Sequence, residues 1–289
     1  MRVKIITAIY SDLFGTEMGG RQGRKDHYRF SLLSIMKMTD ADFVCYTSER
    51  EIGDLKIFFY TQNEIGQDKL KFEIYDLNNN EYAQLINPIK DKERAKTIDR
   101  CYEIQYSKFS FYKKEDKTYD YYFWFDAGLS HTGLIPNMYL GYPGYRGYFE
   151  STLFNNKMLS NLIKKCDNKF VIVAKENDRN FWEGTVDRKF YINYDRSVHI
   201  IGGLFGGKKE LWDNIVDKFN EYLFMVLADE RKLYYEEHIM TLMYQNHKDW
   251  FTTLNFDIWW HEDNHKPNAD GFFEQNKSFY KILEELNYE

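Results

Sequence analysis

The sequence predicts an α/β protein built on a parallel sheet. Three apolar runs, at residues 3–10, 41–47 and 121–125, are short and bounded by polar or turn-forming residues, as strands covered on both faces are. Between the first two runs, apolar residues recur at helical spacing, which gives the order strand, loop, helix, strand. That order is the beginning of a doubly wound sheet.

The remaining elements continue the alternation of strands and helices. The residues that indicate the first helix are Tyr28, Leu32, Ile35 and Met36. Further along the chain we expect strands at 71–77, 169–175, 198–205 and 250–260, and helices within 91–112, 211–226, 236–244 and at the C-terminus. The strand at 198–205 is expected to break at Gly206-Gly207.

Composition and charge exclude several classes of protein. With 289 residues, of which 43% are hydrophobic and 29% charged, the chain can bury the core of one domain with appendages. A formal net charge of -6 gives the whole molecule no general affinity for nucleic acid or anionic membranes. Three scattered cysteines and the lack of a long apolar segment lead us to expect a soluble cytoplasmic protein.

Asp126 ends the aromatic run Tyr-Tyr-Phe-Trp-Phe and is followed by Ala127 and Gly128. Ligands of open α/β sheets bind outside the carboxyl ends of the strands, which is where Asp126 is expected to lie. The small residues after it would let a bulky anionic ligand, or the metal of that ligand, approach the backbone. The alternative is a carboxylate that caps the turn after the strand.

Two glycine pairs surround an apolar dipeptide in segment 202–207, Gly-Gly-Leu-Phe-Gly-Gly, just before a long amphipathic helix. Such glycines allow either close packing of a strand against its neighbours or the approach of a flat polar substrate to the main chain. On the second interpretation, Gly202 and Gly203 contact the acceptor of a transfer reaction.

Glu236 and Glu237 begin a predicted helix. Acids in a first turn interact favourably with the helix dipole, which is a sufficient structural reason for them. The functional alternative is a carboxylate aimed at an electrophilic carbon, such as the anomeric carbon of a sugar, which it attacks or whose developing positive charge it stabilises. The residues alone leave both interpretations open.

Arg21, Arg24, Lys25 and Arg29 form a basic cluster after the first strand and its loop. Guanidinium groups can bind phosphates through two hydrogen bonds each, so the cluster could hold a diphosphate. Solvated charges at the start of a helix are the alternative. The glycines of the loop match neither the dinucleotide-binding fingerprint nor the P-loop, so a dehydrogenase or an NTPase has no motif support.

His261, Glu262 and His265 match the letters of the zinc-protease motif H-E-x-x-H. That motif must lie on a helix for both histidines to face one metal. The polar residues between the histidines and Pro267 after them disfavour a helix, so a metalloprotease is a remote alternative. One of these histidines could instead be a ligand of a hard divalent ion.

In this order the segments resemble glycosyltransferases of the GT-A fold. Phe-Trp-Phe-Asp-Ala-Gly at 123–128 resembles the W-[IF]-D-A-G strand end of the bacterial HtrL/YibB-like glycosyltransferase family. Segment 202–207 and its long helix resemble both that family and the retaining glycosyltransferases of the blood-group type, in which an acidic pair follows. The resemblance implies one GT-A domain over 1–289, with a mixed, mainly parallel sheet flanked by helices. Its nucleotide-sugar-binding half would be 1–130, and its acceptor-binding half, with a C-terminal helix, 131–289.

The resemblance also implies roles for individual residues. Asp126 takes the place of the first acid of the D-x-D motif, which holds the sugar nucleotide and its metal, and Glu237 lies beside the anomeric carbon with Glu236 next to it. A manganese or magnesium ion is expected on Asp126 and on His261 or His265. The residues expected to bind the nucleotide sugar are Thr7, Ala8, Tyr10, Arg24, Asp126, Ala127 and Gly128.

The second acid of D-x-D is Gly128 in this chain, which leaves dependence on a metal open. Because the departing diphosphate must be neutralised, Arg24 and its neighbours could take over from the ion. The expected reaction is transfer of a sugar from a nucleotide-diphosphate sugar, such as a UDP-sugar, to a bacterial surface glycan or to a modified base of phage DNA. The alternatives are a non-catalytic protein that binds nucleotides or sugars and, remotely, the zinc metalloprotease.

Overall fold

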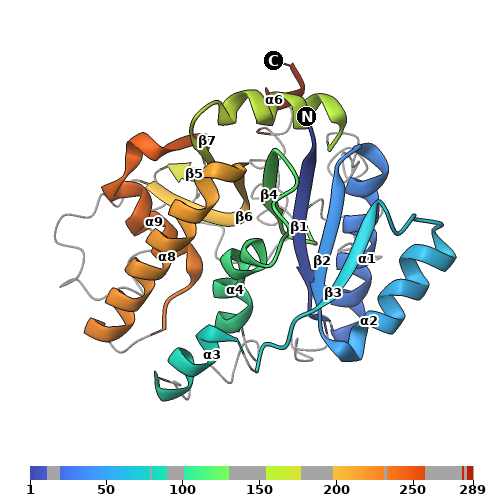
Figure 1. The fold of residues 1–289 in the computed structure, drawn as a ribbon, viewed down its shortest axis with the longest axis horizontal. Coiled ribbons are helices and arrows are strands. Elements are labelled where there is room, and N and C mark those ends of the chain that lie inside the picture. Colours follow the sequence, from blue (N-terminus) through green and yellow to red (C-terminus); the bar gives the residue numbers. More distant parts are fainter. Residues whose placement is uncertain are drawn as a thin grey trace, which may run out of the picture.

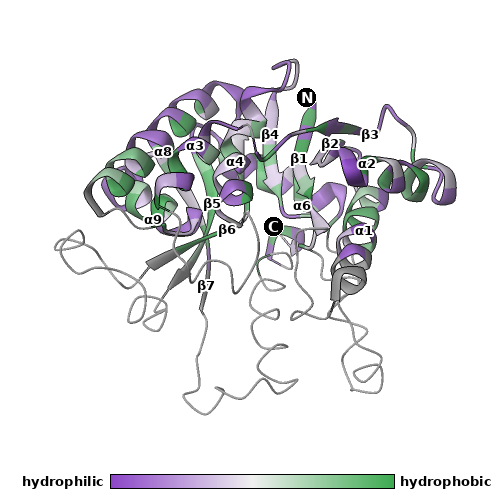
Figure 2. Ribbon diagram, turned by 90° about the horizontal axis from the view of Figure 1, so that it is seen from below, coloured by the Kyte–Doolittle hydropathy of each residue, from purple (hydrophilic) through white to green (hydrophobic). Residues whose placement is uncertain are grey.

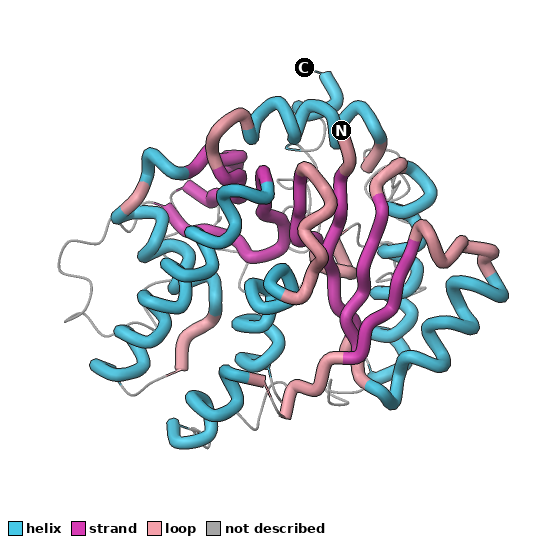
Figure 3. Tube along the Cα trace, viewed as in Figure 1, coloured by secondary structure: helices cyan, strands magenta, loops and turns pink. Residues whose placement is uncertain are grey.

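The structure, a computed structural model, has helices on both sides of a central sheet (Figure 1, Figure 3). It describes residues 1–11, 20–78, 80–89, 101–129, 154–176, 198–230, 233–257, 282 and 285–288.

The sheet has seven strands in the order β3-β2-β1-β4-β6-β5-β7. β6 is antiparallel to both of its neighbours, β4 and β5, whereas the other pairs of adjacent strands are parallel. The strands are β1 (Val3–Ile9), β2 (Asp42–Thr47), β3 (Leu70–Ile74), β4 (Tyr121–Phe125), β5 (Phe170–Glu176), β6 (Val198–Lys208) and β7 (Phe251–Asp257). This mixed, mainly parallel sheet flanked by helices confirms the predicted fold class.

The central strands bury both of their faces, which explains their continuous apolar sequences. In β4, Tyr122 and Trp124 belong to one hydrophobic core, and Phe123 and Phe125 belong to the other. All four side chains are at most 2% exposed. Because alternate side chains point to opposite sides of a sheet, both cores require helices to cover them.

One layer of helices covers each face of the sheet. The core that includes Phe123 is completed by α1 (Gly20–Met38), α2 (Glu49–Lys56) and α6 (Asn156–Cys166). The core that includes Trp124 is completed by α3 (Glu81–Ile86), α4 (Cys101–Lys113), α8 (Lys209–Glu230) and α9 (Glu236–Asn246). Figure 2 shows α3, α4 and α8 on one side of the sheet and α1 on the other. Shorter helical turns lie at Ile57–Gln62, Asn87–Ile89, Lys248–Trp250 and 285–288.

Side chains cap several of these helices at their N-termini. Ser48 before α2, Asn80 before α3 and Asn155 before α6 each accept a hydrogen bond from the backbone N–H three residues later. α9 differs, because the residue before it is Tyr235, whose side chain makes no capping hydrogen bond. Among the described residues, none of the helices is long and apolar enough to cross a membrane.

The prediction that β6 breaks at Gly206-Gly207 is wrong, because the strand continues through both glycines to Lys208. Gly206 has a φ of 157°, and a Cβ there would lie 2.4 Å from the carbonyl oxygen of Tyr122 on β4. The missing side chain therefore allows β6 to pack closely against β4.

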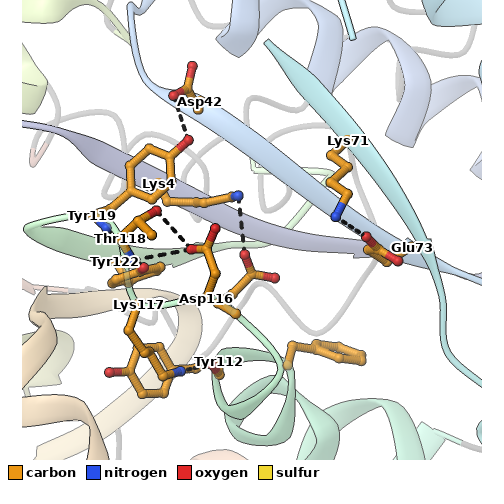
Figure 4. A network of polar contacts seen from close by, with 12 residues as sticks. Lys4, Asp42, Lys71, Glu73, Tyr112, Asp116, Lys117, Thr118, Tyr119 and Tyr122 are labelled. Atoms are coloured by element: carbon orange, nitrogen blue, oxygen red, sulfur yellow. Dashed lines mark hydrogen bonds and ion pairs between the residues drawn. The ribbon is translucent and has the colours of Figure 1, made fainter. Parts of the chain in front are cut away.

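A polar network holds the turn between α4 and β4 at the amino ends of the strands (Figure 4). Lys4 Nζ of β1 lies 3.2 Å from Glu115 Oε2, and the two side chains are only 9% and 6% exposed. Tyr46 of β2 donates a hydrogen bond to the same carboxylate. The network holds the residues before β4 in place. Asp126 follows the other end of β4 and so lies at the opposite edge of the sheet.

Candidate active site

Asp126 lies directly after β4, at the carboxyl edge of the sheet, as predicted. Its backbone N–H donates to the carbonyl oxygen of Gly203 on β6 at 2.9 Å. Its carboxylate Oδ1 accepts a hydrogen bond from Trp124 Nε1 at 2.8 Å, and the side chain is 43% exposed. Ala127 and Gly128, both buried, form the turn that follows. A carboxylate that is held at a strand end and remains open to solvent is suited to bind a ligand.

Lys108 of α4 brings the predicted acids together. Its Nζ lies 3.1 Å from Asp126 Oδ1 and 2.6 Å from Glu236 Oε1, and it donates to the carbonyl oxygen of Gly202 at 2.9 Å. The Lys108 side chain is only 7% exposed. Two acids that are distant in sequence therefore share one buried cation. We call Asp126, Glu236, Glu237 and Lys108 the carboxylate cluster.

Glu236 and Glu237 lie in the first turn of α9, as predicted, but they have different surroundings. Glu236 is 2% exposed and contacts Lys108. Glu237 is half-buried, and its Oε1 accepts a hydrogen bond from the N–H of Gly202 at 2.9 Å. Gly202 lies where β6 extends beyond the end of β4, so a side chain of α9 takes the place of a strand partner.

Gly202 leaves room for the carboxylate cluster. A Cβ on Gly202 would lie 2.3 Å from Glu236 Oε1 and 3.2 Å from Lys108 Nζ. At Gly203, a Cβ would lie 3.6 Å from Asp126 Oδ2, which is an ordinary contact. The observed position of the Glu236 carboxylate therefore favours a glycine at position 202, and acceptor binding by Gly202 and Gly203 stays a prediction.

The carboxylate cluster contains three carboxylates and one ammonium, which leaves two negative charges in excess when all are ionised. Burial raises the pKa of Glu236 to about 7; the Lys108 ammonium opposes this shift, and the carboxylates of Glu237 and Asp126 add to it. Burial also lowers the pKa of Lys108, but the surrounding carboxylates outweigh burial and hold that pKa above its ordinary value. Lys108 is therefore charged at neutral pH.

The predicted nucleotide-binding residues lie at the end of β1, where Thr7 and Ala8 pair with β2. Tyr10 is 3% exposed, and its hydroxyl donates to the carbonyl oxygen of Tyr75 at 2.9 Å, so its ring belongs to the core. Thr7 is fully buried, and its Oγ1 has no hydrogen-bond partner among the described residues. Ala8 is half-buried. A role for these three residues in binding the base and ribose stays a prediction.

Two residues of the basic cluster after β1 form ion pairs with an acid. Lys25 Nζ lies 2.5 Å and Arg29 Nη2 3.9 Å from Asp54 Oδ2 on α2. The Asp54 side chain is 60% exposed, whereas those of Lys25 and Arg29 are only 21% and 12% exposed, so these two cations are not fully solvated charges. The side chains of Arg21 and Arg24 lie outside the description, and phosphate binding by Arg24 stays a prediction.

The H-E-x-x-H motif, with His261 and His265, lies outside the described residues. In the part of the chain that the structure describes, no three His, Cys, Asp or Glu side chains are arranged to hold a metal ion. Asp126 contacts the ammonium of Lys108, and Gly128 has no carboxylate. These residues do not by themselves fit a divalent ion, which would need further ligands such as the two histidines.

Lys108 is the residue of the cluster that the sequence prediction missed. It is the single charged residue in Tyr-Ser-Lys-Phe-Ser-Phe-Tyr at 106–112. The aromatic residues of this stretch are buried, so a lysine among them has to meet an acid inside the protein. An isolated lysine in an apolar helix is the signal that could have identified it.

No protein-family model and no curated protein matches the sequence. Among solved structures, mouse xyloside xylosyltransferase 1 in its apo form is similar, with a TM-score of 0.53 and 10% identity over 97% of this chain and 94% of that chain. The 4-diphosphocytidyl-2C-methyl-D-erythritol synthase from Anaerococcus prevotii has a TM-score of 0.44 and 12% identity, over 97% of this chain and 96% of that one. The glycosyltransferase GlyE in Streptococcus pneumoniae has a TM-score of 0.41 and 7% identity, over 99% of this chain and 51% of that chain. The first similarity shows a shared GT-A-like fold, and the narrower resemblances stay predictions.

Proposed function

We propose that the chain is a glycosyltransferase that moves a sugar from a nucleotide-diphosphate sugar to an acceptor. The observation that carries the proposal is the convergence of Asp126, Glu236 and Glu237 at the carboxyl edge of the sheet, where ligands of open α/β sheets bind. The fold that the chain shares with a xylosyltransferase supports the proposal.

The excess negative charge of the carboxylate cluster suits the chemistry of glycosyl transfer. When the bond between the anomeric carbon and the diphosphate breaks, positive charge develops on the sugar ring. A carboxylate already fixed beside that carbon stabilises the charge without having to reorganise. We assign this role to Glu237, and we assign hydrogen bonding to the donor sugar to Asp126, whose side chain is 43% exposed. Glu236, buried against Lys108, holds the cluster together.

Our finer proposals concern the leaving group and the acceptor. The departing diphosphate needs a cation or hydrogen-bond donors, and our candidates are Arg24 and a manganese or magnesium ion held with His261 or His265. Retention of the anomeric configuration is favoured by the blood-group-like order of the segments. The acceptor is a bacterial surface glycan, with a modified phage DNA base as the second candidate.

Release of nucleoside diphosphate tests the proposal. The purified chain is incubated with a panel of nucleotide sugars, UDP-xylose among them, with manganese and with EDTA. Glu237→Gln keeps a carbonyl oxygen for the Gly202 N–H, so this variant should fold and bind the donor while its turnover falls about 100-fold or more. Asp126→Ala should weaken donor binding in calorimetry. Asp217→Asn, at an acid that is 78% exposed on α8, is the matched control.

Each outcome separates the alternatives. Unchanged turnover of Glu237→Gln would remove this residue from the mechanism, and normal donor binding by Asp126→Ala would contradict the role given to Asp126. Nucleotide binding without release of nucleoside diphosphate would favour a non-catalytic binding protein. Activity that EDTA abolishes and manganese restores would support dependence on a metal, and the same loss in His261→Ala or His265→Ala would support the proposed ligands.

A further inference from the structure

Tyr235 is an unusual residue for its position. It occupies the N-cap of α9, immediately before Glu236, and its side chain makes no capping hydrogen bond. Ser, Thr, Asp or Asn at an N-cap would accept a hydrogen bond from a backbone N–H and stabilise the helix. Tyr235 is also 36% exposed, so its ring is far from fully buried. A residue that departs from the usual N-cap types and keeps part of its ring exposed is a candidate for function.

The rings of Tyr235 and Tyr102 stack on one another, and we call them the tyrosine pair. Their ring centroids are 5.6 Å apart, and the ring planes meet at 19°. Tyr102 lies in the first turn of α4 and packs, half-buried, against the core. The ring of Tyr235 also contacts His238, with centroids 6.0 Å apart. These neighbours hold the ring of Tyr235 in place while part of it stays exposed.

The tyrosine pair lies beside the carboxylate cluster, because the same two elements carry both. Glu236 follows Tyr235 directly, and its Oε1 lies 2.6 Å from Nζ of Lys108 on α4. A second hydrogen bond joins these elements, from the hydroxyl of Tyr106 on α4 to the carbonyl oxygen of Tyr234. A molecule stacked on the tyrosine pair would therefore lie next to the two elements that carry Lys108, Glu236 and Glu237.

We propose that the tyrosine pair binds the acceptor and that the acceptor is a neutral saccharide, an inference that rests on the proposed function. One face of a pyranose ring presents C–H groups, which pack on the electron-rich face of an aromatic ring. The hydroxyl groups at the edge of the sugar can then hydrogen-bond to the carboxylates. A nucleic acid is disfavoured here, because the cluster has an excess of negative charge and the chain a net charge of -6.

Binding of methyl glycosides tests this inference without requiring turnover. Saturation-transfer NMR with the methyl glycosides of glucose, galactose, mannose and xylose identifies those that bind, and titration gives their dissociation constants. Tyr235→Ser removes the ring and provides the missing cap, which offsets part of the packing lost against Tyr102 and His238, and its melting temperature checks that the variant stays folded. Its dissociation constant should nevertheless rise about fivefold or more, as expected for the loss of one stacking contact.

Two further variants serve as controls. Tyr235→Phe keeps the ring and should bind the glycosides as the wild type does. Tyr288→Ala removes a tyrosine that is 84% exposed and is distant in sequence from the tyrosine pair, and it should also bind normally.

Several results would overturn the inference. These are unchanged glycoside binding by Tyr235→Ser, equal loss of binding by Tyr288→Ala, and a wild-type chain that binds none of the four glycosides. Binding of a single-stranded DNA oligonucleotide in their place, with an affinity that falls steeply with salt, would favour the nucleic-acid acceptor. Failure of the proposed function is distinguishable, because it shows as absent release of nucleoside diphosphate while glycoside binding persists.

Discussion

Replacing Lys108 by methionine perturbs the carboxylate cluster at its centre. Methionine retains most of the apolar stem of lysine, so the main loss is the ammonium that lies 3.1 Å from Asp126 Oδ1 and 2.6 Å from Glu236 Oε1. Glu236 is 2% exposed, so its carboxylate would be left buried without its partner. Breaking a buried ion pair in this way costs about 3–5 kcal/mol. That is a large part of the roughly 5–15 kcal/mol by which a typical domain is stable.

The loss of stability in Lys108→Met should depend on pH in a defined direction. The Lys108 ammonium lowers the pKa of Glu236, so without it this pKa lies above the wild-type value of about 7. At about pH 5.5 the carboxyl group of the variant is protonated and carries no unpaired charge. At about pH 8 the group must either stay charged or take up a proton, and both cost free energy. The variant should therefore lose more stability at the higher pH.

Urea unfolding followed by circular dichroism measures these free energies. Lys113→Met is the matched control, because Lys113 lies on the same helix, is 41% exposed and is 3.9 Å from Asp217, a surface pair worth about 0–1 kcal/mol. The double variant Lys108→Met/Glu236→Gln removes both buried charges and should recover much of the loss. Equal losses for Lys108→Met and Lys113→Met at both pH values would refute the buried ion pair.

Two further predictions concern the same cluster. Gly202→Ala should lower the free energy of unfolding by about 1–3 kcal/mol, because its Cβ would lie 2.3 Å from Glu236 Oε1. Gly53→Ala on α2, where a Cβ meets nothing within 4 Å, should instead stabilise by about 0.5–1 kcal/mol, and equal effects of the two alanines would contradict the packing described. Glu236 has a folded pKa of about 7 against an ordinary 4.5, so its contribution to stability is present below about pH 4.5 and is lost as the pH rises through 7. Glu236→Gln should not show this loss of stability. Unfolding free energies that change with pH in the same way for the variant and the wild type would argue against the raised pKa of Glu236.

The central sheet could be predicted because strands buried on both faces have a simple sequence pattern. Residues 121–125 are apolar or aromatic without alternation, which fits a strand between two layers of helices. The course of β6 could not be predicted in this way. A glycine pair looks the same in a sequence whether a strand ends there or a neighbouring strand approaches closely. In this protein the glycine allows the close approach of β4, because a Cβ on Gly206 would lie 2.4 Å from the carbonyl oxygen of Tyr122.

The candidate site could be predicted in part. Asp126 could be placed because it follows a buried strand, and Glu236 and Glu237 because they begin an amphipathic helix. Lys108 could not be assigned to them, since its partner Glu236 is 128 residues away and only the packing of α4 against α9 brings the two together. The sequence pattern thus predicted the acids, whereas their shared counter-charge depends on tertiary contacts.

Adjacent residues of a helix point in directions about 100° apart, and Glu236 and Glu237 accordingly have different surroundings. Glu236 points into the protein, where Lys108 pairs with it, and Glu237 faces the edge of β6, where the Gly202 N–H orients it. The buried acid helps to keep the ammonium charged and thereby holds Asp126 in place, whereas the other acid stays partly accessible to a ligand. Lys108→Met should therefore lower turnover by displacing the acids, and Glu237→Gln by removing the charge beside the anomeric carbon.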